Sequence, residues 1–219
     1  SPMVVHVARR ALQSGASRVV VAVDDELIRL ACEAHGIEVL MTSSQHPTGT
    51  DRLSEMVQLL ELSDDEIVVN VQGDEPLIPP ELINEVAHTL STHPQAAIAT
   101  AALPIIDAKE INNPNVVKVV CNQAKEALYF SRAPIPFARN PKEFIAPYYR
   151  HIGMYAYRVS FLRAFAQLEP APIEQAESLE QLRALYNGYK IAVMITPTAP
   201  PPGVDTFEDL ERVRKLLGH

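Results

Sequence analysis

Residues 66–76 read EIVVNVQGDEP. The apolar stretch from Glu66 to Val71 predicts a short strand that is buried on both faces of a parallel sheet. Gly73 permits a tight turn or the close approach of a ligand, and Asp74 follows at the strand end, where open α/β sheets hold their ligands. A carboxylate there is a natural oxygen ligand for magnesium that bridges phosphates. A plain polar turn, in which Asp is common, is the alternative.

Helices and short apolar strands alternate around this strand. Helical periodicity or flanking signals predict helices over residues 3–13, 25–35, 51–60 and 79–90, and strands over 18–23 and 37–41. This βαβα order predicts an α/β fold with a doubly wound, mostly parallel sheet.

The pattern changes beyond residue 115, where polar loops separate strands. We predict strands over 116–121, 127–130, 152–157 and 190–195, and helices over 159–168, 178–186 and 206–217. We therefore expect one domain over residues 1–219, with a β-rich subregion at about 115–160.

Composition limits the classes of partner. The chain has 219 residues, of which 47% are hydrophobic, and a formal net charge of -8. An acidic chain of this kind is not expected to bind nucleic acid, although metal ions and a few arginines can still neutralise a nucleotide locally. No apolar run approaches the roughly 20 residues that span a bilayer, and no signal peptide opens the chain. We expect a cytoplasmic protein with no membrane partner.

Seven further blocks, together with residues 67–78, resemble one family in the same order along the whole chain. The blocks are Met41-Thr42-Ser43 with His46, Gly49-Thr50-Asp51-Arg52-Leu53, NPNVVKVV at 113–120, ALYFSR at 127–132, RHIGMYAYR at 150–158, SLEQLR at 178–183 and GVDT at 203–206. The family is the 3-deoxy-manno-octulosonate (Kdo) cytidylyltransferases, also called CMP-Kdo synthetases. The resemblance implies a nucleotide-diphospho-sugar transferase-like fold, with CTP and Kdo as substrates in lipopolysaccharide biosynthesis.

The resemblance also implies a catalytic magnesium held by Asp74 and Asp205. From the residues alone, Asp205 and Glu208 read equally well as a capping box for the last helix. Thr206 and Asp209 form a second such box, which would leave Asp205 outside the helix and free. Two aspartates that meet in space would suit a magnesium-supported in-line displacement at phosphorus.

Further site residues follow from the resemblance. Arg52 is expected at the reacting centre, and the nucleotide positions are Thr42, Ser43, His46, Gly49 and Thr50. The sugar positions are Gln72, Arg132, His151, Tyr155, Glu180 and Gln181. The residues themselves leave other readings open, since Thr50-Asp51 is a plain helix cap and His151 and Tyr155, four apart on one strand face, also suit the edge of a core. The β-rich subregion is expected to bind sugar and to form a homodimer.

The chain departs from the family at its beginning. Family members open with a strand and a cationic phosphate-binding loop, whereas this sequence begins Ser1-Pro2-Met3. We therefore expect an N-terminally truncated form that turns over poorly, because those cations hold the triphosphate. The alternatives are a cytidylyltransferase for another acidic sugar, such as sialic acid, and an inactive module that binds nucleotide or sugar.

Overall fold

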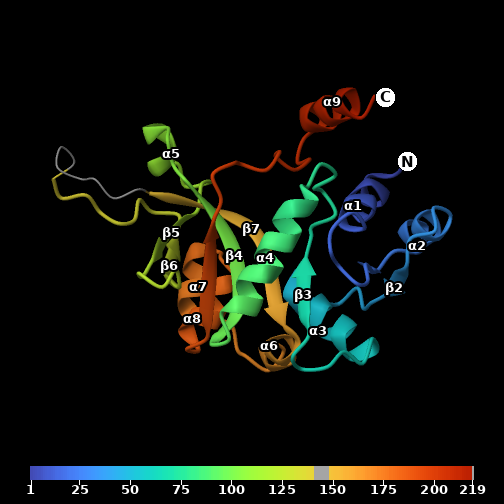
Figure 1. Cartoon of the computed structure of the whole chain (residues 1–219), viewed down its shortest axis with the longest axis horizontal. Helices are drawn as coiled ribbons and strands as arrows, with labels where there is room; N and C mark the ends of the chain where they lie inside the picture. The colour runs from blue at the N-terminus through green and yellow to red at the C-terminus, as the bar shows by residue number, and fades with distance from the viewer. Residues whose placement is uncertain (141–147, 219) are drawn as a thin grey trace.

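The computed structural model describes residues 1–140 and 148–218. Within these residues the largest element is a six-stranded sheet in the order β6-β5-β7-β4-β8, with β3 also paired to β7 (Figure 1). Its strands are β3 (Ile67–Asn70), β4 (Ala96–Pro104), β5 (Lys118–Cys121), β6 (Ala127–Ser131), β7 (Tyr149–Arg158) and β8 (Lys190–Ile195). The β-rich subregion thus belongs to the main sheet through β5 and β7, and its residues 141–147 lie outside the described residues.

The strand directions correct one part of the predicted fold. β4 is parallel to β8, but β7 runs antiparallel to β3, β4 and β5, and β5 runs antiparallel to β6. The α/β class is confirmed, whereas the mostly parallel sheet is wrong because the pairings make it mixed. The residues of a strand do not encode its direction, and β7 lies antiparallel between β3 and β4.

A second sheet contains β1 (Val21–Val23) and β2 (Val39–Met41), which are parallel. Among the described strands, β1 pairs only with β2, and β3 pairs only with β7. A cavity of about 1310 Å³ is lined by residues of both β1 and β3. The predicted strand over 18–23 is therefore shorter than expected and only partly buried.

Helices cover both faces of the large sheet, as a doubly wound fold requires. On one face, Leu82, Val86 and Leu90 of α4 pack with Ala99 and Met154. On the other face, α3, α6 and α8 pack side chains such as Val57, Phe161 and Leu182 around Phe130. The helices are α1 (Met3–Ala11), α2 (Glu26–Glu33), α3 (Gly49–Leu59), α4 (Pro80–Thr92), α5 (Ala108–Ile111), α6 (Val159–Phe165), α7 (Pro172–Glu177), α8 (Gln181–Tyr186) and α9 (Phe207–Leu216).

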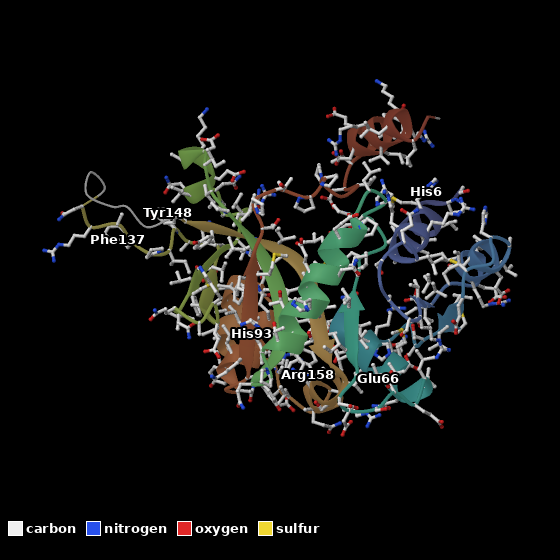
Figure 2. The ribbon with its side chains drawn as sticks, viewed as in Figure 1. His6, Glu66, His93, Phe137, Tyr148 and Arg158 are labelled. Atoms are coloured by element: carbon white, nitrogen blue, oxygen red, sulfur yellow. The ribbon has the colours of Figure 1, made fainter. Side chains whose placement is uncertain are left out.

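Arg158 fixes the end of α4 to the sheet. Its guanidinium donates hydrogen bonds to the carbonyls of Leu90 and Ala96 at 2.9 Å each, and to that of His93 at 3.3 Å. Figure 2 places Arg158 and His93 at the same end of the sheet, where the chain leaves α4 and enters β4. These bonds link carbonyls of the last turn of α4, of the connecting turn and of the start of β4 to one guanidinium. Among the residues in the structure, no helix has both the length and the apolarity to cross a membrane.

Candidate active site

Asp74 lies directly beyond the carboxyl end of β3, as predicted. The chain turns there through a hydrogen bond from the Glu75 amide to the Gln72 carbonyl. One carboxylate oxygen of Asp74, Oδ1, is buried and has no hydrogen-bond partner within the described chain. An unsatisfied buried oxygen costs free energy unless a ligand completes it. This oxygen, on a hard carboxylate, suits a cation such as magnesium.

The segment that carries Asp205 contacts the Asp74 backbone. The Val204 amide donates a hydrogen bond of 2.8 Å to the Asp74 carbonyl. Gly203 passes so close that a Cβ atom on it would lie 3.3 Å from the same carbonyl oxygen. The residue before the α9 cap is therefore held beside the strand end, although 131 positions separate the two aspartates in the sequence.

The cap of α9 decides between the two readings of Asp205. Thr206 is the cap, since its hydroxyl accepts from the Asp209 amide and its own amide donates to the Asp209 carboxylate. Asp205 consequently lies outside the helix, and its carboxylate is not used in the capping box. Nowhere in the part of the chain that the structure describes do three or more His, Cys, Asp or Glu side chains gather as a metal cluster.

Burial and the neighbouring Asp74 carboxylate raise the pKa of Glu75 to about 7. Burial is the larger cause, because it penalises the charged form of the side chain. The strand end is therefore already an acidic site, where one of two adjacent carboxyl groups is partly protonated near neutral pH.

Arg52 reaches this region from the first turns of α3. Its guanidinium donates to the Thr42 hydroxyl at 2.9 Å and pairs with Asp24 at 2.5 Å. Arg52, Gly49 and Gly73 line the 1310 Å³ cavity together. Two predicted positions, Thr42 and Arg52, are thus joined, and Asp24 is a further partner that the sequence did not single out.

The start of α3 corrects a detail of the prediction. The cap is Thr48 rather than Thr50 or Asp51, because the extended Thr48 accepts a hydrogen bond from the Asp51 amide through its hydroxyl. Thr50 is instead buried inside the first turn and lines both cavities. Thr50 therefore has no capping role, and its side chain instead hydrogen-bonds those of Tyr157 and Glu180 at the junction of the cavities.

Ser43 and His46 are held by Glu55 on α3. The Glu55 carboxylate accepts a hydrogen bond from the Ser43 amide at 2.8 Å and contacts His46 Nε2 at 2.5 Å. None of Thr42, Ser43 and His46 is among the described residues that line the large cavity, although Thr42 bonds Arg52, which does line it. Their assignment to the nucleotide stays a prediction.

A second cavity, of about 350 Å³, collects five of the six predicted sugar positions. They are Gln72, His151, Tyr155, Glu180 and Gln181. Gln181 Nε2 is a buried donor with no partner in the described residues, so it is available to an acceptor on a ligand. The five positions come from the turn after β3, from β7 and from the start of α8, and their sugar contacts stay a prediction.

The two cavities adjoin each other. Thr50, Gln72, Tyr155, Tyr157 and Glu180 line both. Burial raises the pKa of Glu180, whose carboxylate also accepts a 3.0 Å hydrogen bond from the Thr48 hydroxyl. A group bound in one cavity would therefore lie next to a group bound in the other.

His151 and Tyr155 form an aromatic wall with Phe130. The His151 ring stands edge-on to Phe130 with 4.9 Å between ring centroids, and lies 5.4 Å from Tyr155. Burial lowers the pKa of His151 to about 3 and raises that of Tyr155. Both rings are consequently neutral at physiological pH.

Arg132 is the predicted sugar position that the structure does not bring to the cavity. Its guanidinium donates to the carbonyls of Glu177, Pro114 and Ser178, and the residue is absent from the lining of either cavity. Backbone carbonyls hold the side chain in place, so Arg132 joins three segments around the site. Its proposed sugar contact therefore stays a prediction without geometric support.

Two positions near the cavity were not singled out from the sequence. Thr100 bonds His151, and Lys118 is a fully buried ammonium group that donates to three carbonyls around Arg132 and residues 113–116. A lysine inside an apolar strand was the available signal for Lys118. Thr100, in an alanine-rich stretch, gave none.

Comparison with known proteins identifies the family. The cytidylyltransferase family model matches residues 1–191. A 3-deoxy-manno-octulosonate cytidylyltransferase of Polynucleobacter asymbioticus is 63% identical over 219 residues, which cover 100% of this chain and 86% of that protein. The chain belongs to the 3-deoxy-manno-octulosonate cytidylyltransferase family. A relative of the same name from Nitrosococcus oceani is 54% identical over 226 residues and covers 99% of this chain and 86% of its own length.

Solved structures agree with this family. A CMP:2-keto-3-deoxy-manno-octonic acid synthetase complexed with CTP has a TM-score of 0.91 and 42% identity, covering 100% of this chain and 88% of that one. A 4-diphosphocytidyl-2C-methyl-D-erythritol synthase, at a TM-score of 0.63 and 12% identity, shares the fold alone. Membership of the cytidylyltransferase family makes the chain a nucleotidyltransferase, and the α/β fold class is that of these relatives.

Proposed function

We propose that this protein transfers CMP from CTP to Kdo and releases pyrophosphate. The observation that carries the proposal is the pair of adjoining cavities at the carboxyl end of β3, which share Thr50, Gln72 and Glu180. Gly73 lines the larger cavity and directly precedes Asp74, whose buried oxygen has no partner in the described chain. The names of the relatives supply the two substrates. The alternatives are another acidic sugar as acceptor and an inactive binding module.

The reaction needs the anomeric hydroxyl of Kdo to be held in contact with the α-phosphorus of CTP. The anomeric hydroxyl oxygen of Kdo attacks the α-phosphorus of CTP, and a new P–O bond forms as the bond to the bridging oxygen breaks. Pyrophosphate leaves with that oxygen, and the hydroxyl proton passes to solvent. In this proposal the large cavity holds the nucleotide, the small cavity holds the sugar, and Glu180 and Gln72 lie at their junction. Positioning of this kind contributes most of the catalysis in phosphoryl-type transfers.

We propose that Asp74 and Asp205 hold magnesium. The fit rests on the buried Asp74 oxygen without a partner, on the hard carboxylate donors, and on the contact between the two segments. When bound, the metal would neutralise negative charge on the triphosphate. Two carboxylates suffice, since magnesium is commonly held by one or two of them together with substrate phosphates and water.

Chain residues have three further roles in this proposal. Arg52, oriented by Thr42 and Asp24, presents its positively charged guanidinium to the nucleotide cavity. The nucleotide contacts are assigned to Thr42, Ser43, His46, Gly49 and Thr50 by the family resemblance. The sugar contacts are assigned to Gln72, His151, Tyr155, Glu180 and Gln181, which line one cavity.

The test measures pyrophosphate release from CTP with Kdo, with sialic acid and without an acceptor, beside calorimetric binding of each ligand. We expect release that depends on Kdo. Faster release with sialic acid would favour the other-sugar alternative. Binding of both ligands with no release would favour the inactive module, and binding of neither would refute the proposal.

The metal assignment has its own variant. Asp74→Asn keeps the shape of the side chain and removes its charge, so we expect magnesium-dependent pyrophosphate release to be lost. The matched control is Asp65→Asn, which changes an exposed aspartate beside β3 and should leave release unchanged. Release retained by Asp74→Asn would disprove the assigned metal role.

We further infer that the protein acts as a cytoplasmic homodimer in lipopolysaccharide biosynthesis. The family resemblance supports the inference, and the edge position of β6, with its exposed Leu128, gives the β-rich subregion a surface for pairing. Light scattering tests the oligomer, since a dimer has twice the chain mass of 24.2 kDa. A species at the mass of one chain would contradict it.

A further inference from the structure

Thr100 lies at an irregular point of the sheet beside His151. It faces Tyr155 in the register of β4 with β7, while the next residue, Ala101, already faces Ile152. Two extra residues of β7 therefore lie between these pairs, and their carbonyls are displaced from the regular ladder. Thr100 is fully buried, so its hydroxyl has only protein groups to bond.

Three polar groups surround the Thr100 hydroxyl. Its oxygen lies 2.7 Å from the Met154 carbonyl, 3.1 Å from the Ile152 carbonyl and 2.9 Å from His151 Nε2. A hydroxyl has one hydrogen, which it donates here to a carbonyl, because a carbonyl oxygen can only accept. Toward the imidazole the hydroxyl oxygen must then accept, and Nε2 must carry the hydrogen.

The other ring nitrogen is directed elsewhere. No described residue hydrogen-bonds to Nδ1 of His151, yet Nδ1 is not among the buried polar atoms that lack a partner. It is therefore accessible, and the ring lines the 350 Å³ cavity. Burial also lowers the pKa of this histidine to about 3, so the ring is neutral at pH 7.

We propose that Thr100 is a positioning residue that holds His151 as the neutral Nε2–H tautomer, so that Nδ1 accepts a hydrogen bond from a hydroxyl group of the sugar acid. The identity of this ligand rests on the proposed function. An uncharged acceptor selects a hydroxyl and gives no counter-charge to a carboxylate. The acid group of the sugar must therefore be neutralised by an arginine or a metal and not by His151.

The tautomer is measured directly, without turnover. In a ¹⁵N-labelled sample, long-range ¹H–¹⁵N correlations of imidazole rings distinguish a protonated from an unprotonated nitrogen, and the seven histidines are separated by comparison with His151→Gln. We expect an unprotonated Nδ1 and a protonated Nε2 in His151. Kdo should then shift the Nδ1 resonance, as a new hydrogen bond to that atom requires. The opposite tautomer, or a doubly protonated ring, overturns the proposal.

Two substitutions of Thr100 test its role. Thr100→Val keeps the shape and removes the hydroxyl, so we expect the tautomer signal to change and the KM for Kdo to rise about two- to twelvefold, the effect of one hydrogen bond. The KM for CTP should stay the same. Thr100→Ser restores the hydroxyl and should restore both readings.

The experiments can refute the role of Thr100 and the proposed function independently of each other. An unchanged tautomer and an unchanged Kdo KM in Thr100→Val would refute the role of Thr100 while the enzyme stays active. If the wild-type protein releases no pyrophosphate with any sugar acid, the function fails, but the tautomer measurement still decides the inference about His151. Should Thr100→Val not fold, the wild-type spectrum and Thr100→Ser decide it.

Discussion

The buried ion pair between Glu174 and Arg183 fixes the wall of the sugar cavity. The guanidinium meets the carboxylate through two bonds, Nη2 to Oε1 at 2.6 Å and Nε to Oε2 at 2.8 Å, and the side chains are only 8% and 10% exposed. Oε2 also accepts from the Ala171 amide at 2.9 Å, and the guanidinium lies 4.4 Å from the centre of the Phe165 ring. The pair thus joins α7 to α8, whose first residue, Gln181, lines the cavity.

Arg183→Met removes the cation and leaves a buried carboxylate without its partner. Breaking a buried pair from one side costs about 3–5 kcal/mol. For a chain of this length each kcal/mol moves Tm by about 2–4 °C, so Tm should fall by about 6–20 °C. The double substitution of Glu174→Leu and Arg183→Met removes both charges together. The free energy of unfolding of this double variant should fall far less, because replacing a whole buried pair by apolar groups is often neutral.

Thermal unfolding followed by circular dichroism gives Tm, and urea unfolding gives the free energy of unfolding at constant m-value. The matched control is Arg163→Met, since Arg163 pairs with Asp64 at the surface, where the side chains are 41% and 66% exposed. Such a pair contributes about 0–1 kcal/mol. The reasoning is refuted if Arg183→Met lowers the free energy of unfolding no more than Arg163→Met does. It is also refuted if the double variant is as unstable as Arg183→Met.

Three other predictions concern the site. Lys118→Met leaves three carbonyls without their buried donor, so the free energy of unfolding should fall by about 2–4 kcal/mol in urea, and the KM for Kdo should rise more than that for CTP. Burial raises the folded pKa of Glu180 above the unfolded value, so the stability it contributes is present below pH about 4 and lost as pH rises. Glu180→Gln should therefore have a higher Tm than the wild type at pH 8 and an equal one at pH 4, and equal gains at both would contradict this. Gly203→Val forces the chain away from the Asp74 carbonyl and should raise the magnesium concentration needed for half-maximal release, which an unchanged midpoint would disprove.

Local patterns predicted much of the fold. β8 was predicted with its observed bounds, because the apolar run from Lys190 to Ile195 is bounded by Gly188 and Pro197. α4 and α9 were likewise predicted to within about two residues, since periodicity and start signals agreed. These elements carry their own signals in the sequence and need no distant contact to be recognised.

β4, which is paired on both sides, gave no such signal. β4 reads AAIATAALP, and alanine is depleted in strands, so this segment was not predicted. It is a strand because β7 and β8 bond it on both sides and its small side chains let α4 pack closely. Tertiary context therefore determined it, and Thr100 within it was missed for the same reason.

In the candidate site, too, some features follow from local sequence and others depend on distant contacts. Asp74 could be placed from its strand and turn alone, but its contact with residue 204 depends on a chain segment that follows β8. The bond between Thr48 and Glu180 joins residues 132 positions apart, and no local pattern encodes it. The family resemblance predicted sugar contacts for both Glu180, which lines the cavity, and Arg132, whose guanidinium donates to backbone carbonyls instead.

Capping explains how Asp205 becomes available to a ligand. Two overlapping boxes were open from the sequence, and a carboxylate can cap a helix or hold a metal but serves poorly in both. Thr206 and Asp209 satisfy the first turn of α9 by themselves, so the helix has no need of Asp205. The hydrogen bond from Val204 to Asp74 then fixes the position of the released residue. The cap and the strand end therefore act together, and the proposed metal pair depends on both.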